Sequence, residues 1–140
     1  MGRNLENQAI AMWTTITGDP AVRMDDYAKV DALFLPHLNA DVDPIPRPPY
    51  FLEVHGRRTP LINSPNQRLG MKVRVYDAVL NLSKIAKMQV IWLVVGPDVI
   101  LNLSLPAVVD GVQDGRVYFN AAIFSKLESA SNRAFFEGSF

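Results

Sequence analysis

Asp77-Ala-Val-Leu-Asn-Leu-Ser83 recurs in the chain as Asp98-Val-Ile-Leu-Asn-Leu-Ser104, with five of the seven positions identical. Between the two copies lies Val90-Ile-Trp-Leu-Val-Val95, an apolar run rich in the β-branched side chains that favour strands. Gly96-Pro97 then marks a turn into the second copy. The pattern predicts that the two copies are strands of one sheet, in a closely spaced antiparallel core.

Helix signals precede this core. Asn4 can cap a first helix that extends to Thr17, because the apolar residues after it follow a helical spacing. Asp19-Pro20 gives the start signal of a second helix, an N-cap followed by proline at the first helical position. We expect this helix to reach about Leu35. Its apolar side would consist of Met24, Tyr27, Val30 and Phe34.

Further strands are predicted around the repeat. Residues 50–56 form one short strand, and residues 71–75 alternate apolar and basic side chains before a β-bulge or a new strand at Tyr76. Asp114-Gly115 predicts a hairpin turn before residues 116–119. From Asn120 we expect a last helix, or alternatively a continuation of the strand.

Together these elements predict an α+β fold in one domain over residues 1–140, with two N-terminal helices packed on an antiparallel sheet and a C-terminal helix. Residues 36–49 contain five prolines, which favour an extended proline-rich arm over a helix or a sheet. Residues 57–70 form a long basic loop, and a loop of that length is usually functional or ordered by a partner.

The composition excludes several kinds of site. The chain has no cysteine, which rules out disulfides, thiolate metal sites and cysteine nucleophiles. The first residues lack the apolar run of a secretory signal, and Gly96-Pro97-Asp98 interrupts the longest apolar stretch. We therefore expect no signal peptide and no transmembrane helix, and a location in a virion or in the cytoplasm.

Charge is distributed unevenly along a chain whose net charge is zero. Residues 57–87 carry seven bases and one acid, whereas residues 1–56 carry four bases and eight acids. The simplest interpretation is a solvated strand face with a basic loop. Two sharper ones are pairing between basic and acidic faces of neighbouring copies, and contact with nucleic acid without sequence specificity.

No motif supplies a catalytic apparatus. His37 and His55 lack further ligands at the spacing of a metal site, and residues 39–50 lack the glycine and glutamate of a calcium loop. Glu53 and His55 point to the same side of one strand and could form an acid–base pair, although a surface contact is the simpler interpretation. We predict no catalytic residue, no cofactor and no metal.

Three segments are instead predicted to contact other proteins, because they are too stiff, too basic or too apolar to be self-sufficient. They are the proline-rich arm, the basic loop with the strand after it, and the aromatic C-terminus. The candidate interface residues are Pro44, Pro46, Arg47, Pro48, Pro49, Arg57, Arg58, Arg68, Lys72, Arg74, Phe135, Phe136 and Phe140. We expect the protein to form a homo-oligomer, for which a ring is one arrangement. We also expect it to bind neighbouring structural proteins.

The order of elements resembles that of the small head–tail connector and tail-terminator proteins of tailed bacteriophages. Those proteins place N-terminal helices, here residues 4–17 and 19–35, before an antiparallel sheet, here residues 71–119. Their protruding loops bind neighbours in a ring. The resemblance implies a non-enzymatic structural protein of the virion neck or tail, whose basic loop faces an acidic neighbour or packaged DNA.

Two other functions stay open. A small-molecule-binding or hydrolytic α+β domain would use Tyr76, Trp92, His55 and Glu53 in a pocket. A small regulatory or inhibitory protein encoded by a phage fits the chain length and the lack of motifs equally well.

Overall fold

The computed structural model describes residues 2–24, 30–36, 48–62, 64 and 66–127. The elements in chain order are α1 (Gly2–Thr17), β1 (Ala21–Arg23), β2 (Ala32–Phe34), β3 (Tyr50–Gly56), β4 (Arg68–Lys72), α2 (Val73–Ala86), β5 (Gln89–Val95), β6 (Ile100–Leu105), β7 (Val112–Gln113), β8 (Arg116–Asn120), the 3-10 turn η2 (Ala121–Ile123) and β9 (Ser125–Leu127). Within the described residues, neither α1 nor α2 has the length and apolar character that a membrane-spanning helix requires.

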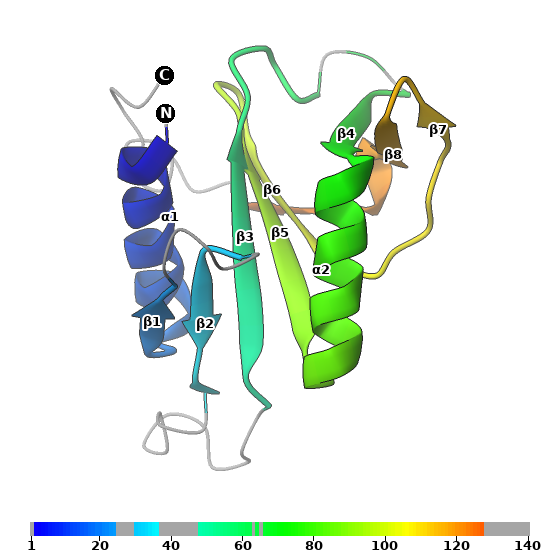
Figure 1. The fold of residues 1–140 in the computed structure, drawn as a ribbon. Helices are drawn as coiled ribbons and strands as arrows, with labels where there is room; N and C mark the ends of the chain where they lie inside the picture. Colours follow the sequence, from blue (N-terminus) through cyan, green and yellow to red (C-terminus); the bar gives the residue numbers. More distant parts are fainter. Residues whose placement is uncertain (1, 25–29, 37–47, 63, 65, 128–140) are drawn as a thin grey trace.

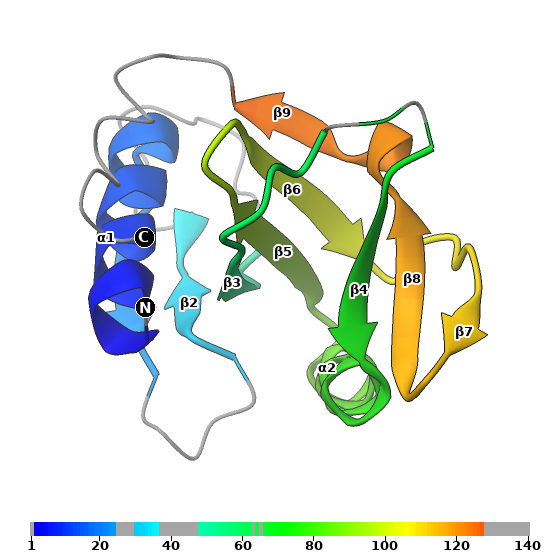
Figure 2. The same ribbon diagram turned by 90° about the horizontal axis from the view of Figure 1, so that it is seen from above.

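The strands form a large and a small sheet. The large sheet has the order β1-β2-β3-β5-β6-β9, and the small sheet has the order β4-β8-β7. Helix α1 covers one face of the large sheet, whereas α2 and the small sheet lie on the other (Figure 1). Seen from above, β8 continues through η2 into β9, so that one chain segment joins the two sheets (Figure 2).

The α+β prediction is confirmed, but the large sheet is mixed. Strands β3 and β5 are parallel, because β4 and α2 form the crossover that returns the chain to the same end of the sheet. The other strand pairs are antiparallel.

Each face of the large sheet has its own apolar core. On the α1 face, Leu5, Ala9 and Met12 of the helix pack with Leu52 and Leu93 of the sheet. The core on the opposite face is larger and includes Phe51, Met71, Val79, Trp92, Leu101 and Phe119. Successive residues of β3 therefore point alternately into two different layers, which places Glu53 and His55 on the α2 side.

The predicted second helix is wrong: the described residues of 19–35 contain the two short strands β1 and β2. Asp19 is buried and accepts a hydrogen bond from the Tyr50 hydroxyl at 2.8 Å instead of capping a helix. In β2, Ala32 and Phe34 are fully buried and the residue between them is half-buried, which is the alternation of a strand. Residues 25–29 lie outside the described residues.

The two copies of the repeat adopt different structures. Residues 77–83 belong to α2, where Tyr76 and Val79 turn towards the core at a helical spacing, whereas residues 100–104 belong to β6. The prediction of two equivalent strands is therefore wrong. The strand predicted at residues 71–75 is displaced towards the N-terminus, because β4 pairs with β8 and ends at Lys72.

The other predicted helices and strands agree with the structure before Asn120 and disagree after it. The helix α1, the strands β3, β5 and β6 and the hairpin β7–β8 are confirmed, although α1 begins at Gly2 and therefore includes Asn4 instead of being capped by it. Asp114 and Gly115 have the positive φ angles of 53° and 73° that a tight hairpin turn requires. The last helix is wrong: the Asn120 side chain accepts from the Ala122 amide at 2.9 Å and caps only the 3-10 turn before β9. Residues 128–140 lie outside the described part of the chain.

Candidate active site

Two carboxyl side chains meet where β2 begins beside β3. The register pairs Ala32 with Leu52, which places Asp31 opposite Glu53. The Asp31 amide donates to the Leu52 carbonyl at 2.9 Å, and Asp31 Oδ2 accepts from the Val54 amide at 2.7 Å. The Asp31 and Glu53 side chains are only 14% and 12% exposed, and they lie within hydrogen-bonding reach of each other.

Burial makes this carboxylate pair hold a proton. It raises the pKa of Asp31 to about 7, and the hydrogen bond and negative charge of Glu53 add to the increase. Burial also raises the pKa of Glu53, with a further contribution from the charge of Glu6. Since two adjacent buried carboxylates repel each other, the pair takes up a proton close to neutral pH. A pKa near neutrality is typical of catalytic carboxyl groups.

An arginine links the pair to helix α1. Arg23 Nη2 lies 2.5 Å from Glu6 Oε2, and Arg23 Nη1 lies 3.9 Å from Asp31 Oδ1. The same Nη1 donates to the Asp31 backbone carbonyl at 3.3 Å. Because Arg23 is bonded most closely to Glu6, it neutralises only part of the charge of the pair. Among the described residues, no three acidic or histidine side chains come close enough to form a metal cluster.

His55 follows Glu53 on the same side of β3 and is held by a tryptophan. Its Nδ1 accepts from Trp92 Nε1 at 2.9 Å, and its Nε2 lies 3.7 Å from Glu53 Oε2. Burial lowers the pKa of His55 to about 4, and the charge of Arg57 adds to the decrease. The imidazole is therefore neutral at pH 7. Because Nδ1 accepts, the proton is on Nε2, the nitrogen that faces Glu53.

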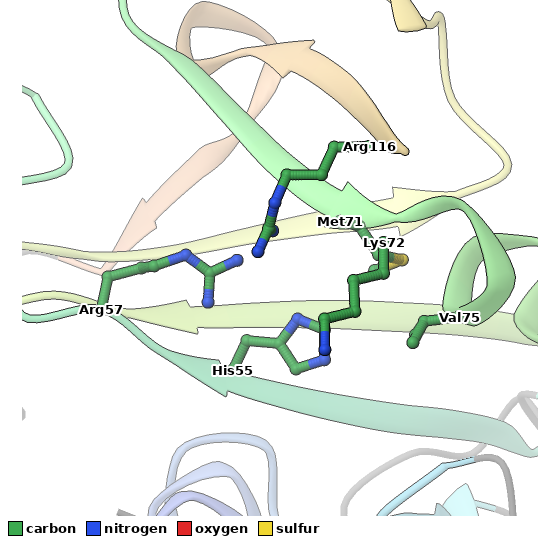
Figure 3. Close-up of a pocket in the computed structure, with 6 residues that line it drawn as sticks. All are labelled: His55, Arg57, Met71, Lys72, Val75 and Arg116. Atoms are coloured by element: carbon green, nitrogen blue, oxygen red, sulfur yellow. The ribbon is translucent and has the colours of Figure 1, made fainter. Parts of the chain in front are cut away.

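A basic cleft of about 480 Å³ opens beside His55, between β3, β4, α2 and β8. We define the basic cleft by its lining residues, which are His55, Arg57, Met71, Lys72, Val75 and Arg116 (Figure 3). Arg57 is held at its wall, where Nη1 donates to the Gly56 carbonyl at 3.0 Å and Nη2 to the Gly70 carbonyl at 2.7 Å. The carboxylate pair and the basic cleft thus share His55.

The structure separates the predicted interface residues. Arg57 and Lys72 line the basic cleft, whereas Arg58 and Arg74 are exposed outside it. Arg68 pairs with Asp110 on the small sheet, with 3.4 Å between Nε and Oδ2.

The proline-rich arm enters the described residues only at its end. Pro48 is exposed and lines a separate pocket with Trp13 and Tyr50, and Pro49 is half-buried. The other candidates and one histidine lie outside the described residues: His37, Pro44, Pro46, Arg47, Phe135, Phe136 and Phe140.

Part of this site agrees with the residues proposed from the sequence for a hydrolytic domain. Glu53, His55 and Trp92 lie together, whereas Tyr76 packs with its ring 5.5 Å from that of Phe119. Four contributors had no place in the predicted sites: Glu6, Arg23, Asp31 and Arg116. The sequence signal for Asp31 is an acid directly before the apolar run of residues 32–35. The predicted second helix covers this segment, so the run was not interpreted as a strand.

Comparisons with known proteins find the fold but no relative in sequence. No protein-family model matches the chain, and a search of curated proteins finds no match. Among solved structures, the chain is similar to Hjc, a Holliday junction resolvase from the archaeal hyperthermophile Archaeoglobus fulgidus. The TM-score is 0.61 at 10% identity, over 88% of this chain and 91% of the resolvase chain.

This likeness corrects the predicted resemblance. The fold is that of a resolvase structure, so the assignment to phage head–tail connector or tail-terminator proteins is wrong. The predictions of a non-enzymatic assembly protein and of a virion component are contradicted with it. The likeness fits the hydrolytic alternative better than the structural role.

Proposed function

We propose that this protein is a nuclease that hydrolyses phosphodiester bonds of DNA at Asp31 and Glu53. The observation that carries the proposal is the buried carboxylate pair, held at neighbouring strands in a fold shared with a DNA junction resolvase. Burying two carboxyl groups side by side destabilises a fold, and such pairs are characteristic of catalytic sites. Among the partners expected from the sequence, DNA would be the substrate.

The carboxylate pair fits a divalent cation of the Mg²⁺ type. Such ions take oxygen ligands and are commonly held by one or two carboxylates together with substrate phosphate. Asp31 and Glu53 supply two oxygen donors whose charge is incompletely neutralised by Arg23. When bound, the cation would screen the carboxylates from the phosphate and polarise the bond to be cleaved.

His55 would act as a hydrogen-bond donor in this reaction. Its Nδ1 is engaged by Trp92, so that Nε2–H is the group presented towards Glu53. A neutral donor stabilises negative charge that develops on a phosphate oxygen in the transition state, without the cost of burying an imidazolium. Trp92 is a positioning residue, since it fixes the tautomer and the orientation of the ring.

The chemical step requires water to attack phosphorus while the bond from phosphorus to the leaving sugar oxygen breaks. The attacking water loses a proton, and the leaving oxygen gains one. A carboxylate of the pair can accept the first proton, since burial already raises the proton affinity of both groups. The second proton comes from solvent.

Cleavage of a four-way DNA junction, a linear duplex and a single strand tests the proposal, with Mg²⁺ or Mn²⁺ and with a chelator as the blank. We expect wild-type protein to cleave at least one of these substrates and Glu53→Gln to reduce the rate at least about a hundredfold. Asp77→Asn is the matched control, because Asp77 is exposed on α2. No cleavage by the wild type with either metal, or equal rates for wild type and Glu53→Gln, would overturn the proposal.

A further inference from the structure

The basic cleft gathers cations that lack acidic partners among the described residues. Within the described residues, no carboxylate forms an ion pair with Arg57, Lys72 or Arg116. Lys72 and Arg116 are directly opposite each other in the β4–β8 ladder. Like charges in that arrangement destabilise a sheet unless something neutralises them.

The side chains converge on the interior of the cleft. Figure 3 shows the guanidinium groups of Arg57 and Arg116 pointing towards each other and Lys72 extending towards His55. Arg57 is fixed by two backbone carbonyls, so it is held in place before any ligand arrives. A preorganised guanidinium loses less conformational entropy on binding an anion than a free one.

The start of α2 adds to the positive potential. Lys72 is its N-cap with no side-chain cap, and its first turn contains no acid, although the Val73 amide donates to the Gly115 carbonyl at 2.9 Å. Val75 of that turn lines the cleft. The positive end of the helix dipole therefore faces the same region as the three cations.

We propose that the basic cleft binds a backbone phosphate of the nucleic-acid substrate, next to the phosphate that is cleaved at Asp31 and Glu53. This assignment rests on the proposed nuclease function, because His55 belongs to both the cleft and the cleavage site. The cleft then sets the position of the strand, and the carboxylate pair performs the reaction. Its binding strength should depend on salt but little on sequence.

Binding of a fluorescent DNA oligonucleotide in chelator, where cleavage cannot occur, tests the cleft separately. Arg116→Gln removes one cation that no carboxylate of the described residues pairs with, and it should raise the Kd about tenfold and reduce the slope of log Kd against log salt by about 0.9. Lys84→Gln is the matched control, since it removes the same charge from an exposed position of α2, and it should change the Kd less than about twofold.

The outcomes separate the two proposals. Equal affinities of wild type and Arg116→Gln, or equal losses in Arg116→Gln and Lys84→Gln, would overturn the cleft assignment even if wild-type protein cleaves DNA. A selective loss in Arg116→Gln supports the cleft even if no cleavage is found, and in that case only the nuclease proposal fails. Binding of inorganic pyrophosphate without binding of DNA would also overturn the cleft assignment.

Discussion

Replacing Asp31 by asparagine should stabilise the protein at alkaline pH. The asparagine Oδ1 can accept the hydrogen bond that the Val54 amide gives to Asp31, and its Nδ2 can donate to Glu53. The substitution keeps the shape of the side chain and removes only its ability to ionise. The expected gain is therefore the free energy that wild-type protein loses when Asp31 ionises beside Glu53.

The magnitude follows from the pKa of Asp31, which burial raises from 3.8 to about 7. Each pKa unit corresponds to about 1.4 kcal/mol, so ionising Asp31 in the folded protein costs about 4 kcal/mol more than in the unfolded chain. Because the pKa is higher in the folded state, folding takes up a proton between pH 4 and pH 7. The contribution is fully present below pH 4, and it is lost as the pH rises through 7.

Urea denaturation of wild type and Asp31→Asn at pH 4.5 and pH 8.5, both in chelator, measures this difference. The advantage of the variant in unfolding free energy should be about 1 kcal/mol at the lower pH, where Asp31 of the unfolded chain is already mostly ionised, and grow by about 3 kcal/mol at the higher one. Asp77→Asn is the control, because it makes the same replacement at an exposed position of α2. A growth of less than about 1 kcal/mol would refute the reasoning, because Asp31 and Glu53 would then not form a strained pair.

Two further predictions concern the layers around the site. His55 should titrate near pH 4 in an NMR experiment, and a wild-type value near 6.5 would contradict this. Trp92→Phe should raise the pKa of His55 by about one unit, because the hydrogen bond that is lost stabilises only the neutral ring. Gly96→Ala should destabilise the fold by about 1–3 kcal/mol in urea, since the added Cβ would lie 2.4 Å from Cγ of the buried Leu61. Combining it with Leu61→Ala should cost less than the sum of the two single changes, and strict additivity would speak against the clash.

The elements that the sequence predicted correctly are those with an unambiguous period or a local signal. The apolar run in β5, the alternation that continues to Leu105 in β6 and the Asp114-Gly115 turn each admit one interpretation. The β2 segment did not. Val30 and Phe34 are four residues apart, and a spacing of four fits one face of a helix and one face of a strand equally well.

The repeat illustrates the same limit more sharply. Nearly identical heptapeptides form a helix in α2 and part of a strand in β6, so their local sequence does not determine their structure. In β6 the segment lies beside β5 and is buried between two layers. In α2 only Tyr76 and Val79 are buried, and Lys87 ends the helix in a left-handed conformation. Tertiary packing decides between the two structures.

The candidate site could be predicted only where its members share one strand. Glu53 and His55 are two residues apart, and the period of a strand places them on one side. Asp31 joins Glu53 through the register of β2 with β3, and Trp92 reaches His55 through the parallel pairing of β3 with β5. Both pairings depend on long-range topology. The predicted helix over β2 hid the first of them, and with it the pairing of the two carboxyl groups.

We propose that the Asp31–Glu53 pair is kept for chemistry at the expense of stability. The most direct measurement is the cleavage rate of Asp31→Asn on the best DNA substrate, with Mg²⁺, at a pH where the variant is more stable than wild type. We expect a folded, more stable protein whose rate is at least about a hundredfold lower. A variant that gains stability and cleaves at the wild-type rate would contradict it.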